Sequence, residues 1–227
     1  MARTYQSLVV TPAETSVTLA LHNPARKNAI GPRMVNELLY ALEDAHADAA
    51  VRSIVLTGSG DAFCAGGDFA QMTGGGDDLP HKGDYADLLL AITRAEKPVV
   101  ARVNGAAMGG GLGLVAASHF AVAADSAKLG TPEINVGLFP MMIMAVLARV
   151  VPKRRLLEMM LFGEKMTAAD ALVAGLVGKV VPAAELDTAV AAITAAVASK
   201  SPSTIKLGLR AFADQADLSL EAALPML

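Results

Sequence analysis

Apolar segments with the character of strands alternate along this chain with segments whose apolar residues recur at helical spacing. At 16–22 every second residue is apolar, which predicts a strand with one buried face. Other apolar runs are uninterrupted, as is typical of strands inside a parallel sheet that is covered on both faces. The predicted strands span 16–22, 53–58, 98–103 and 120–124, and the predicted helices span 32–47, 85–96 and 141–150. This alternation predicts an α/β fold with parallel strands.

The chain has 227 residues, which is enough for one domain with a sizeable core. From residue 183 onward the sequence is rich in alanine and has a helical pattern. We expect this part to form a layer added to the core, because it offers no second set of strands. The predicted organisation is therefore an α/β core over 1–182 and a helical C-terminal region over 183–227.

Composition argues against several classes of protein. The net charge is −3, and Lys and Arg form no stripe of the kind that binds nucleic acid. The uncharged run 103–124 contains five glycines and three polar side chains, so it does not have the pattern of a membrane span. The single cysteine, Cys64, cannot form an internal disulfide, and we expect a cytoplasmic protein. The four histidines lack the spacing of metal ligands, so no metal site is predicted.

Glycine is concentrated in one part of the chain, where 13 of the 20 glycines lie between Gly58 and Gly113. The run MGGGLGL at 108–114 lacks the Lys-Ser/Thr pair of a P-loop and the third glycine of a dinucleotide fingerprint. Two interpretations stay open: an ordinary turn between strand and helix, or a helix N-terminus whose N–H groups stabilise a developing oxyanion. A second donor could come from FCAGGDF at 63–69. The carboxyl ends of parallel strands share one edge of a sheet, so the two bends could meet there.

Three motifs in this order, FCAGGDF, AAMGGGLGL and LGTPEINVGLFP, resemble the crotonase (enoyl-CoA hydratase/isomerase) superfamily. Their spacing is also similar, with 43 residues from Gly67 to Gly110 and 23 from Gly110 to Glu133. NPARKNAI at 23–30 and EKMTAADALVAGLVGKVVP at 164–182 extend the likeness to nearly the whole chain. The resemblance implies the ClpP/crotonase fold, a spiral of ββα units, with a helical C-terminal layer.

The resemblance also implies roles for individual residues. The backbone N–H groups of Gly67 and Gly110 would hold the thioester carbonyl of an acyl-CoA, and Glu133 would move protons beside it. Coenzyme A would be part of the substrate, with no prosthetic group, and the protein would form a homotrimer or hexamer. The CoA contacts implied by the two matching segments are Arg26, Lys27, Ala29, Ala65, Gly66, Gly67 and Asp68. Asp68 is also expected to fix its turn through side-chain hydrogen bonds.

One position departs from the hydratase pattern. Hydratases carry a second glutamate where this chain has Gly113. A single carboxylate, Glu133, is enough to shuttle a proton between two carbons, so the departure favours isomerisation of a double bond. Two alternatives stay open: a hydratase that holds water in the space beside Gly113, and a catalytically silent protein that binds acyl-CoA. The chain also ends earlier than members of the superfamily usually do, which puts CoA affinity and subunit packing in question.

Two further interpretations concern apolar surroundings. Met141, Met142 and Met144 are expected to belong to the core, with lining of an acyl pocket as the alternative. His119 lies in an apolar context and is expected to be a hydrogen-bonded structural residue.

Overall fold

The computed structural model describes residues 3–68 and 79–227. Its strands are β1 (Leu8–Pro12), β2 (Ser16–Leu21), β3 (Ser53–Gly58), β4 (Ala62–Cys64), β5 (Val99–Val103), β6 (Ala106–Met108), β7 (Phe120–Ala124), β8 (Lys128–Gly130), β9 (Lys165–Thr167) and β10 (Lys179–Val181). Its α-helices are α1 (Pro32–Ala47), α2 (Tyr85–Thr93), α3 (Gly110–Ala117), α4 (Met141–Leu147), α5 (Lys153–Phe162), α6 (Ala168–Val173), α7 (Leu186–Ala198), α8 (Pro202–Gln215) and α9 (Leu220–Met226). Short 3-10 helices are η1 (Pro24–Arg26), η3 (Pro132–Val136) and η4 (Ala183–Glu185).

The strands form two sheets. Within the described residues the larger sheet has the order β1-β2-β3-β5-β7-β10, and its strands are parallel except for the antiparallel pair β1 and β2. This confirms the predicted α/β fold with parallel strands. The smaller sheet, β4-β6-β8-β9, was not predicted. Its strands have three residues each, which is too short for an alternating pattern to be visible in the sequence.

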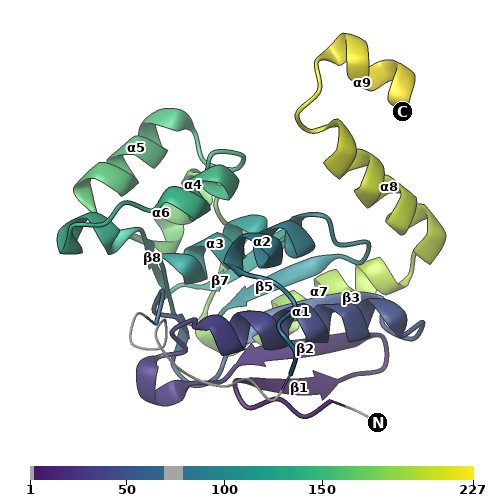
Figure 1. Cartoon of the computed structure of the whole chain (residues 1–227), viewed down its shortest axis with the longest axis horizontal. Coiled ribbons are helices and arrows are strands. Elements are labelled where there is room, and N and C mark those ends of the chain that lie inside the picture. The colour runs from purple at the N-terminus through teal and green to yellow at the C-terminus, as the bar shows by residue number, and fades with distance from the viewer. Residues whose placement is uncertain (1–2, 69–78) are drawn as a thin grey trace.

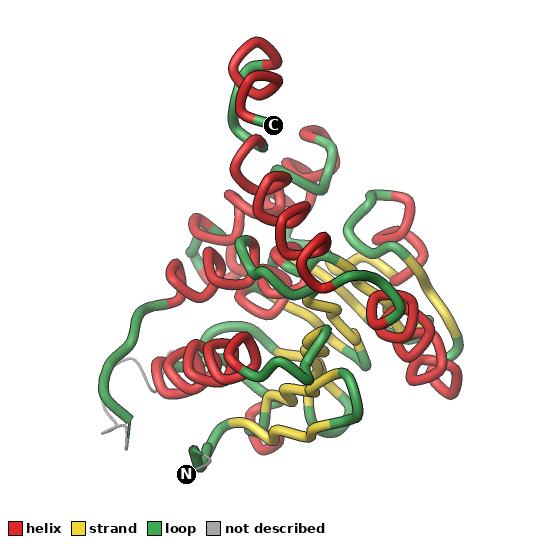
Figure 2. Tube along the Cα trace, turned by 90° about the vertical axis from the view of Figure 1, so that its right-hand side faces the viewer, coloured by secondary structure: helices red, strands yellow, loops and turns green. Residues whose placement is uncertain are grey.

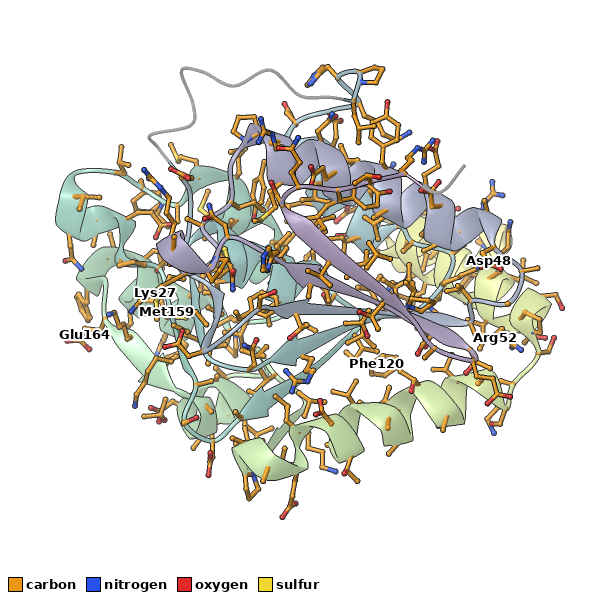
Figure 3. The ribbon with its side chains drawn as sticks, turned by 90° about the horizontal axis from the view of Figure 1, so that it is seen from below. Lys27, Asp48, Arg52, Phe120, Met159 and Glu164 are labelled. Atoms are coloured by element: carbon orange, nitrogen blue, oxygen red, sulfur yellow. The ribbon has the colours of Figure 1, made fainter. Side chains whose placement is uncertain are left out.

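The larger sheet is covered on both faces. Figure 3 shows it between α1 on one side and α7 on the other. Val55, Val100 and Val122 pack with Leu186 and Val190 of α7, whereas their neighbours in the strands join the main core on the opposite face. Both sets of side chains are therefore apolar, which explains the uninterrupted runs in the sequence.

The C-terminal helices differ in how they pack. α7 lies on the sheet, but α8 and α9 extend away from the rest of the molecule (Figures 1 and 2). α8 has no buried residue, and its Leu207 and Phe212 are 71% and 70% exposed. The division of the chain at residues 182 and 183 stays a prediction. Nowhere in residues 3–68 and 79–227 is there a helix with the length and apolar character needed to cross a membrane.

Candidate active site

The two glycine bends lie side by side. Cys64 of β4 is paired in parallel register with Ala107 of β6, and the chain reaches Gly67 and Gly110 three residues later in each case. A Cβ added to Gly109 would lie 3.6 Å from Cα of Gly66, which shows how closely the bends approach. The bends follow β4 and β6 of the smaller sheet, whereas the sequence suggested the longer strands 53–58 and 98–103.

Gly67 and Gly110 both line one cavity of about 480 Å³. Gly110 is the first residue of α3, so its N–H has no acceptor within the helix. Gly67 pairs with Ile30, and that bridge uses the carbonyl of Gly66 and the N–H of Asp68. The N–H of Gly67 therefore points away from Ile30, and no described residue accepts a hydrogen bond from it. Two backbone donors are thus available at the same cavity.

Glu133 brings a carboxylate to the same cavity. It lies in η3, which Thr131 anchors by a hydrogen bond of 2.9 Å from its hydroxyl to the carbonyl of Met159, labelled in Figure 3. Oε2 of Glu133 is buried and has no hydrogen-bond partner among the described residues. Burial raises the pKa of Glu133 above its ordinary value, although a hydrogen bond from its own backbone N–H works in the opposite direction.

Gly109 has room for no side chain. Its φ of +48° and ψ of −120° are a combination that residues with a Cβ rarely adopt. A Cβ there would also lie 2.8 Å from Oε1 of Glu133. The first glycine of the run is therefore where the backbone makes room for the Glu133 carboxylate.

Two other carboxylates among the lining residues have structural roles, one in a helix cap and one in an ion pair. The Asp84 side chain caps α2 by accepting hydrogen bonds from the N–H groups of Ala86 and Asp87. Asp68 is buried and accepts a hydrogen bond of 2.9 Å from the guanidinium of Arg26. Glu133, in contrast, is in neither a helix cap nor an ion pair among the described residues, and its Oε2 has no hydrogen-bond partner there.

The segment 23–30 holds the first glycine bend in place, and most of this was missed from the sequence. The N–H of Ala65 bonds to the carbonyl of Lys27 at 2.9 Å, and Ile30 bridges Gly67. Asn28 is fully buried and its side-chain amide donates to the carbonyls of Ser59 and Ala62. Lys27 and Asn28 both have positive φ, and an asparagine next to a turn is the one signal that could have indicated this.

The predicted CoA-contact residues lie around one corner of the cavity. Gly67 and Asp68 line it. Ala65 and Gly66 instead bond to the segment 23–30, and Ala29 bonds to Arg26 within that segment. The Arg26 side chain is 53% exposed even though it is paired with Asp68. Lys27 is exposed on the surface, where Figure 3 labels it.

The space beside Gly113 is filled, which corrects the expectation that it is vacant. A Cβ added to Gly113 would lie 2.4 Å from the hydroxyl oxygen of Tyr85 and 2.5 Å from Cγ2 of Ile143. The Tyr85 hydroxyl donates a hydrogen bond of 2.5 Å to the carbonyl of Gly110. No water can be held at Gly113 while this tyrosine occupies the space.

The rest of the cavity wall is largely apolar and comes from the segment after Glu133. Leu138, Phe139, Met141, Met142 and Ile143 line it. Met141 and Met142 are 67% and 56% exposed, so their assignment to the core was wrong and the alternative, lining the cavity, is what the structure has. Met144 alone of the three methionines packs against the core, as expected.

His119 has the structural role that its context predicted. Its Nδ1 accepts a hydrogen bond of 3.1 Å from the backbone N–H of Val99, and the backbone N–H of His119 donates to the carbonyl of Val99. Burial lowers the pKa of His119 to about 4, so the ring is neutral near neutral pH. Within the described ranges no cluster of three or more His, Cys, Asp or Glu side chains is arranged to hold a metal ion.

Two amide donors, a partly buried carboxylate and an apolar wall thus meet at one cavity. The family model of enoyl-CoA hydratase/isomerase matches residues 13–226. The chain belongs to the enoyl-CoA hydratase/isomerase family, in the crotonase superfamily.

Several named proteins are similar to this chain. A Bacillus subtilis protein named probable enoyl-CoA hydratase is 38% identical over 194 residues, covering 82% of this chain and 74% of that protein. The human enoyl-CoA hydratase domain-containing protein 3, mitochondrial, is 34% identical over 209 residues, covering 90% of this chain and 69% of that protein. The crystal structure of an enoyl-CoA hydratase from Mycobacterium smegmatis matches with a TM-score of 0.88 and 32% identity, covering 97% of this chain and 87% of the other.

Proposed function

We propose that the protein acts on acyl-CoA thioesters through an enolate, and that it moves a double bond from position 3 to position 2 of the acyl group. The observation that carries the proposal is the free oxygen of Glu133 at a cavity that Gly67 and Gly110 also line. The apolar wall of this cavity suits an apolar acyl chain, and its exposed methionines can adapt to chains of different shape.

The proposed reaction uses each group once. The thioester oxygen binds between the N–H groups of Gly67 and Gly110. Glu133 takes a proton from C2 of the 3-enoyl group, and the electrons of that C–H bond form an enolate whose charge lies on the thioester oxygen. The same carboxyl then returns the proton to C4, which leaves a double bond between C2 and C3. Each fixed donor to such an oxyanion typically contributes about 10²–10³ in rate.

The raised pKa of Glu133 supports this role. A carboxylate that both takes and returns a proton is most effective when its pKa is closer to the working pH. Burial shifts the pKa in this direction. The position of Gly110 at the N-terminus of α3 adds the positive end of the helix dipole to the oxyanion site.

Coenzyme A enters the proposal as part of the substrate, and the protein's own residues around the first glycine bend would meet it. Lys27 is exposed and is the better candidate for a CoA phosphate. Arg26 is already paired with Asp68, although its exposed part can still contact a second anion. Ala29 bonds to the backbone of Arg26 and Ala65 to that of Lys27, and with Gly66 they complete the proposed contact surface.

The test compares turnover of 3-enoyl-CoA and 2-enoyl-CoA by the unmodified protein and by Glu133→Gln. The variant is expected to lose about 10²–10⁴ in kcat, because general acid–base catalysis contributes that much. Glu164→Gln is the matched control, since Glu164 is an exposed glutamate outside the cavity (Figure 3). Unchanged turnover in Glu133→Gln would remove this residue from the mechanism.

The second candidate is hydration of 2-enoyl-CoA, and the names of the relatives favour it. It requires water at a place other than the space beside Gly113, which Tyr85 fills. Formation of 3-hydroxyacyl-CoA at a rate above that of isomerisation would establish it. Tight binding of acyl-CoA with turnover of neither substrate would instead support a catalytically silent protein.

We also propose that the chain forms a homotrimer or hexamer. The support is the apolar surface of α8, where Leu207 and Phe212 have no cover within the described chain. Light scattering coupled to gel filtration measures the mass directly, and a monomer at micromolar concentration would refute this. The cytoplasmic location stays a prediction that rests on the unpaired Cys64, and cell fractionation tests it.

A further inference from the structure

Position 113 is closed to any side chain. The hydroxyl oxygen of Tyr85 and Cγ2 of Ile143 would lie 2.4 Å and 2.5 Å from a Cβ there, and both distances are shorter than real Cβ contacts. The two atoms come from different helices, α2 and α4, which meet α3 at this point. A carboxylate at position 113 could therefore be accommodated only if both Tyr85 and Ile143 moved away.

Tyr85 is held firmly in this place. It is the first residue of α2, directly after the Asp84 cap, and that cap is a full capping box in which Asp87 bonds back to the N–H of Asp84. Its ring lies against the start of α3, since Cζ and Oη would both be 3.6 Å from a Cβ on Gly110. Its hydroxyl proton is donated to the carbonyl of Gly110.

The protonation state of the Tyr85 hydroxyl matters as much as the volume of the side chain. Burial raises the pKa of Tyr85 well above its ordinary value, and the nearby carboxylate of Glu133 acts in the same direction. The side chain is therefore a neutral phenol, whose proton is engaged by Gly110. Such a group cannot take a proton from water, whereas a carboxylate in the same space could.

We propose that Tyr85 is the specificity-determining residue of this site: its side chain fills the space beside Gly113 that a second acid or an attacking water would need. Hydration joins the oxygen of water to C3 of a 2-enoyl group, places one proton on C2 and needs a position for that water. Isomerisation breaks a C–H bond at C2 and forms one at C4, so Glu133 suffices. The inference rests on the proposed function and deepens it.

The experiment measures the ratio of hydration to isomerisation, which does not depend on the fraction of folded enzyme. Tyr85→Ala and Tyr85→Leu each remove the phenol and leave space beside Gly113, and mass spectrometry separates the hydrated product by the added mass of water. The ratio is expected to rise about 10-fold or more, which is a small part of the roughly 10²–10⁴ that a positioned base contributes. Tyr85→Phe keeps the ring and is expected to keep the ratio close to that of the unmodified protein.

Tyr40→Phe is the matched control, because the Tyr40 hydroxyl also donates to a backbone carbonyl, that of Pro80, but lies outside the cavity. An unchanged ratio in both Tyr85→Ala and Tyr85→Leu would overturn the inference while the proposed function stands. Loss of folding in both variants, seen by circular dichroism, would show that the side chain serves the core and would also overturn it. If the unmodified protein does not isomerise 3-enoyl-CoA, the proposed function fails and this inference fails with it.

Discussion

Replacing Gly109 by alanine separates the effect of backbone strain from the effect of moving the Glu133 carboxylate. The new Cβ would lie 2.8 Å from Oε1 of Glu133, and ordinary contact begins at 3.4 Å. The Glu133 carboxylate would have to retreat by about 0.6 Å, the difference between these two distances. It is the end of a flexible side chain with an unbonded oxygen, so it can move at small cost in stability.

The two effects of Gly109→Ala have different sizes. The positive φ of Gly109 makes alanine cost about 1–3 kcal/mol in stability. Each kcal/mol lowers Tm by about 2–4 °C in a chain of this length. Displacing a reacting group by about 1 Å costs about 10²-fold in rate, so we expect a loss of about 10-fold to 10²-fold in kcat.

Gly60→Ala is the matched control, since Gly60 also has positive φ, +75°, but a Cβ there would meet nothing within 4 Å. Thermal unfolding by circular dichroism and turnover of 3-enoyl-CoA are measured for both variants. We expect both to be destabilised, and only Gly109→Ala to lose kcat. If the two variants had the same kcat at equal folded fraction, the contact between position 109 and Glu133 would have no bearing on the reaction, and this reasoning would be refuted.

Charge and burial lead to further expected outcomes at Glu133, Arg26 and His119. The raised pKa of Glu133 means that kcat/KM should fall as the pH drops through a value above the ordinary range of a carboxyl group. The contribution of Glu133 to the free energy of unfolding has the opposite trend, because the folded state binds the proton more tightly than the unfolded state does. The stability gained from this proton is lost as the pH rises through the raised pKa of Glu133. Glu133→Gln should therefore abolish this slope when unfolding is measured as a function of pH. Arg26→Ala leaves the buried Asp68 without the guanidinium and should lower the free energy of unfolding by about 1–2 kcal/mol, a value already discounted for the exposure of Arg26. Denaturant unfolding measures this loss, and Asp68→Asn in the same background is the control. For His119, whose pKa is lowered to about 4, the unfolded state binds the proton first, so stability should fall as pH drops from about 6.5 to 4, and His119→Gln should flatten that part of the profile.

Local patterns were sufficient to predict the fold class. The uninterrupted runs at 53–58 and 120–124 are strands of the larger sheet, and the spacing from residue 32 to 47 is α1. These patterns are reliable because a strand covered on both faces must be apolar throughout, and a helix packed on one face must repeat its apolar residues every three or four positions. The smaller sheet escaped detection because strands of three residues do not show a period.

The candidate site was predicted only as a set of residues. Motif spacing brought Gly67, Gly110 and Glu133 together as a hypothesis, and the structure has all three at one cavity. Nothing in the neighbourhood of Gly113 indicated that a tyrosine 28 positions earlier in the chain would fill the space beside it. The same holds for Asn28, whose side chain ties its own loop to the turn between β3 and β4.

The amino-acid sequence by itself determined the longer strands and helices, the places where the backbone can bend without a side chain, and Glu133 as the candidate acid. Only the tertiary structure decided which side chain lies where a Cβ of residue 113 would be, which oxygen of Glu133 has no hydrogen-bond partner, and which methionines line the cavity. The physical reason is the range of the forces involved. Backbone preference and apolar periodicity act between near neighbours in the chain, whereas a vacancy or an unmet hydrogen bond exists only after distant segments have packed against one another.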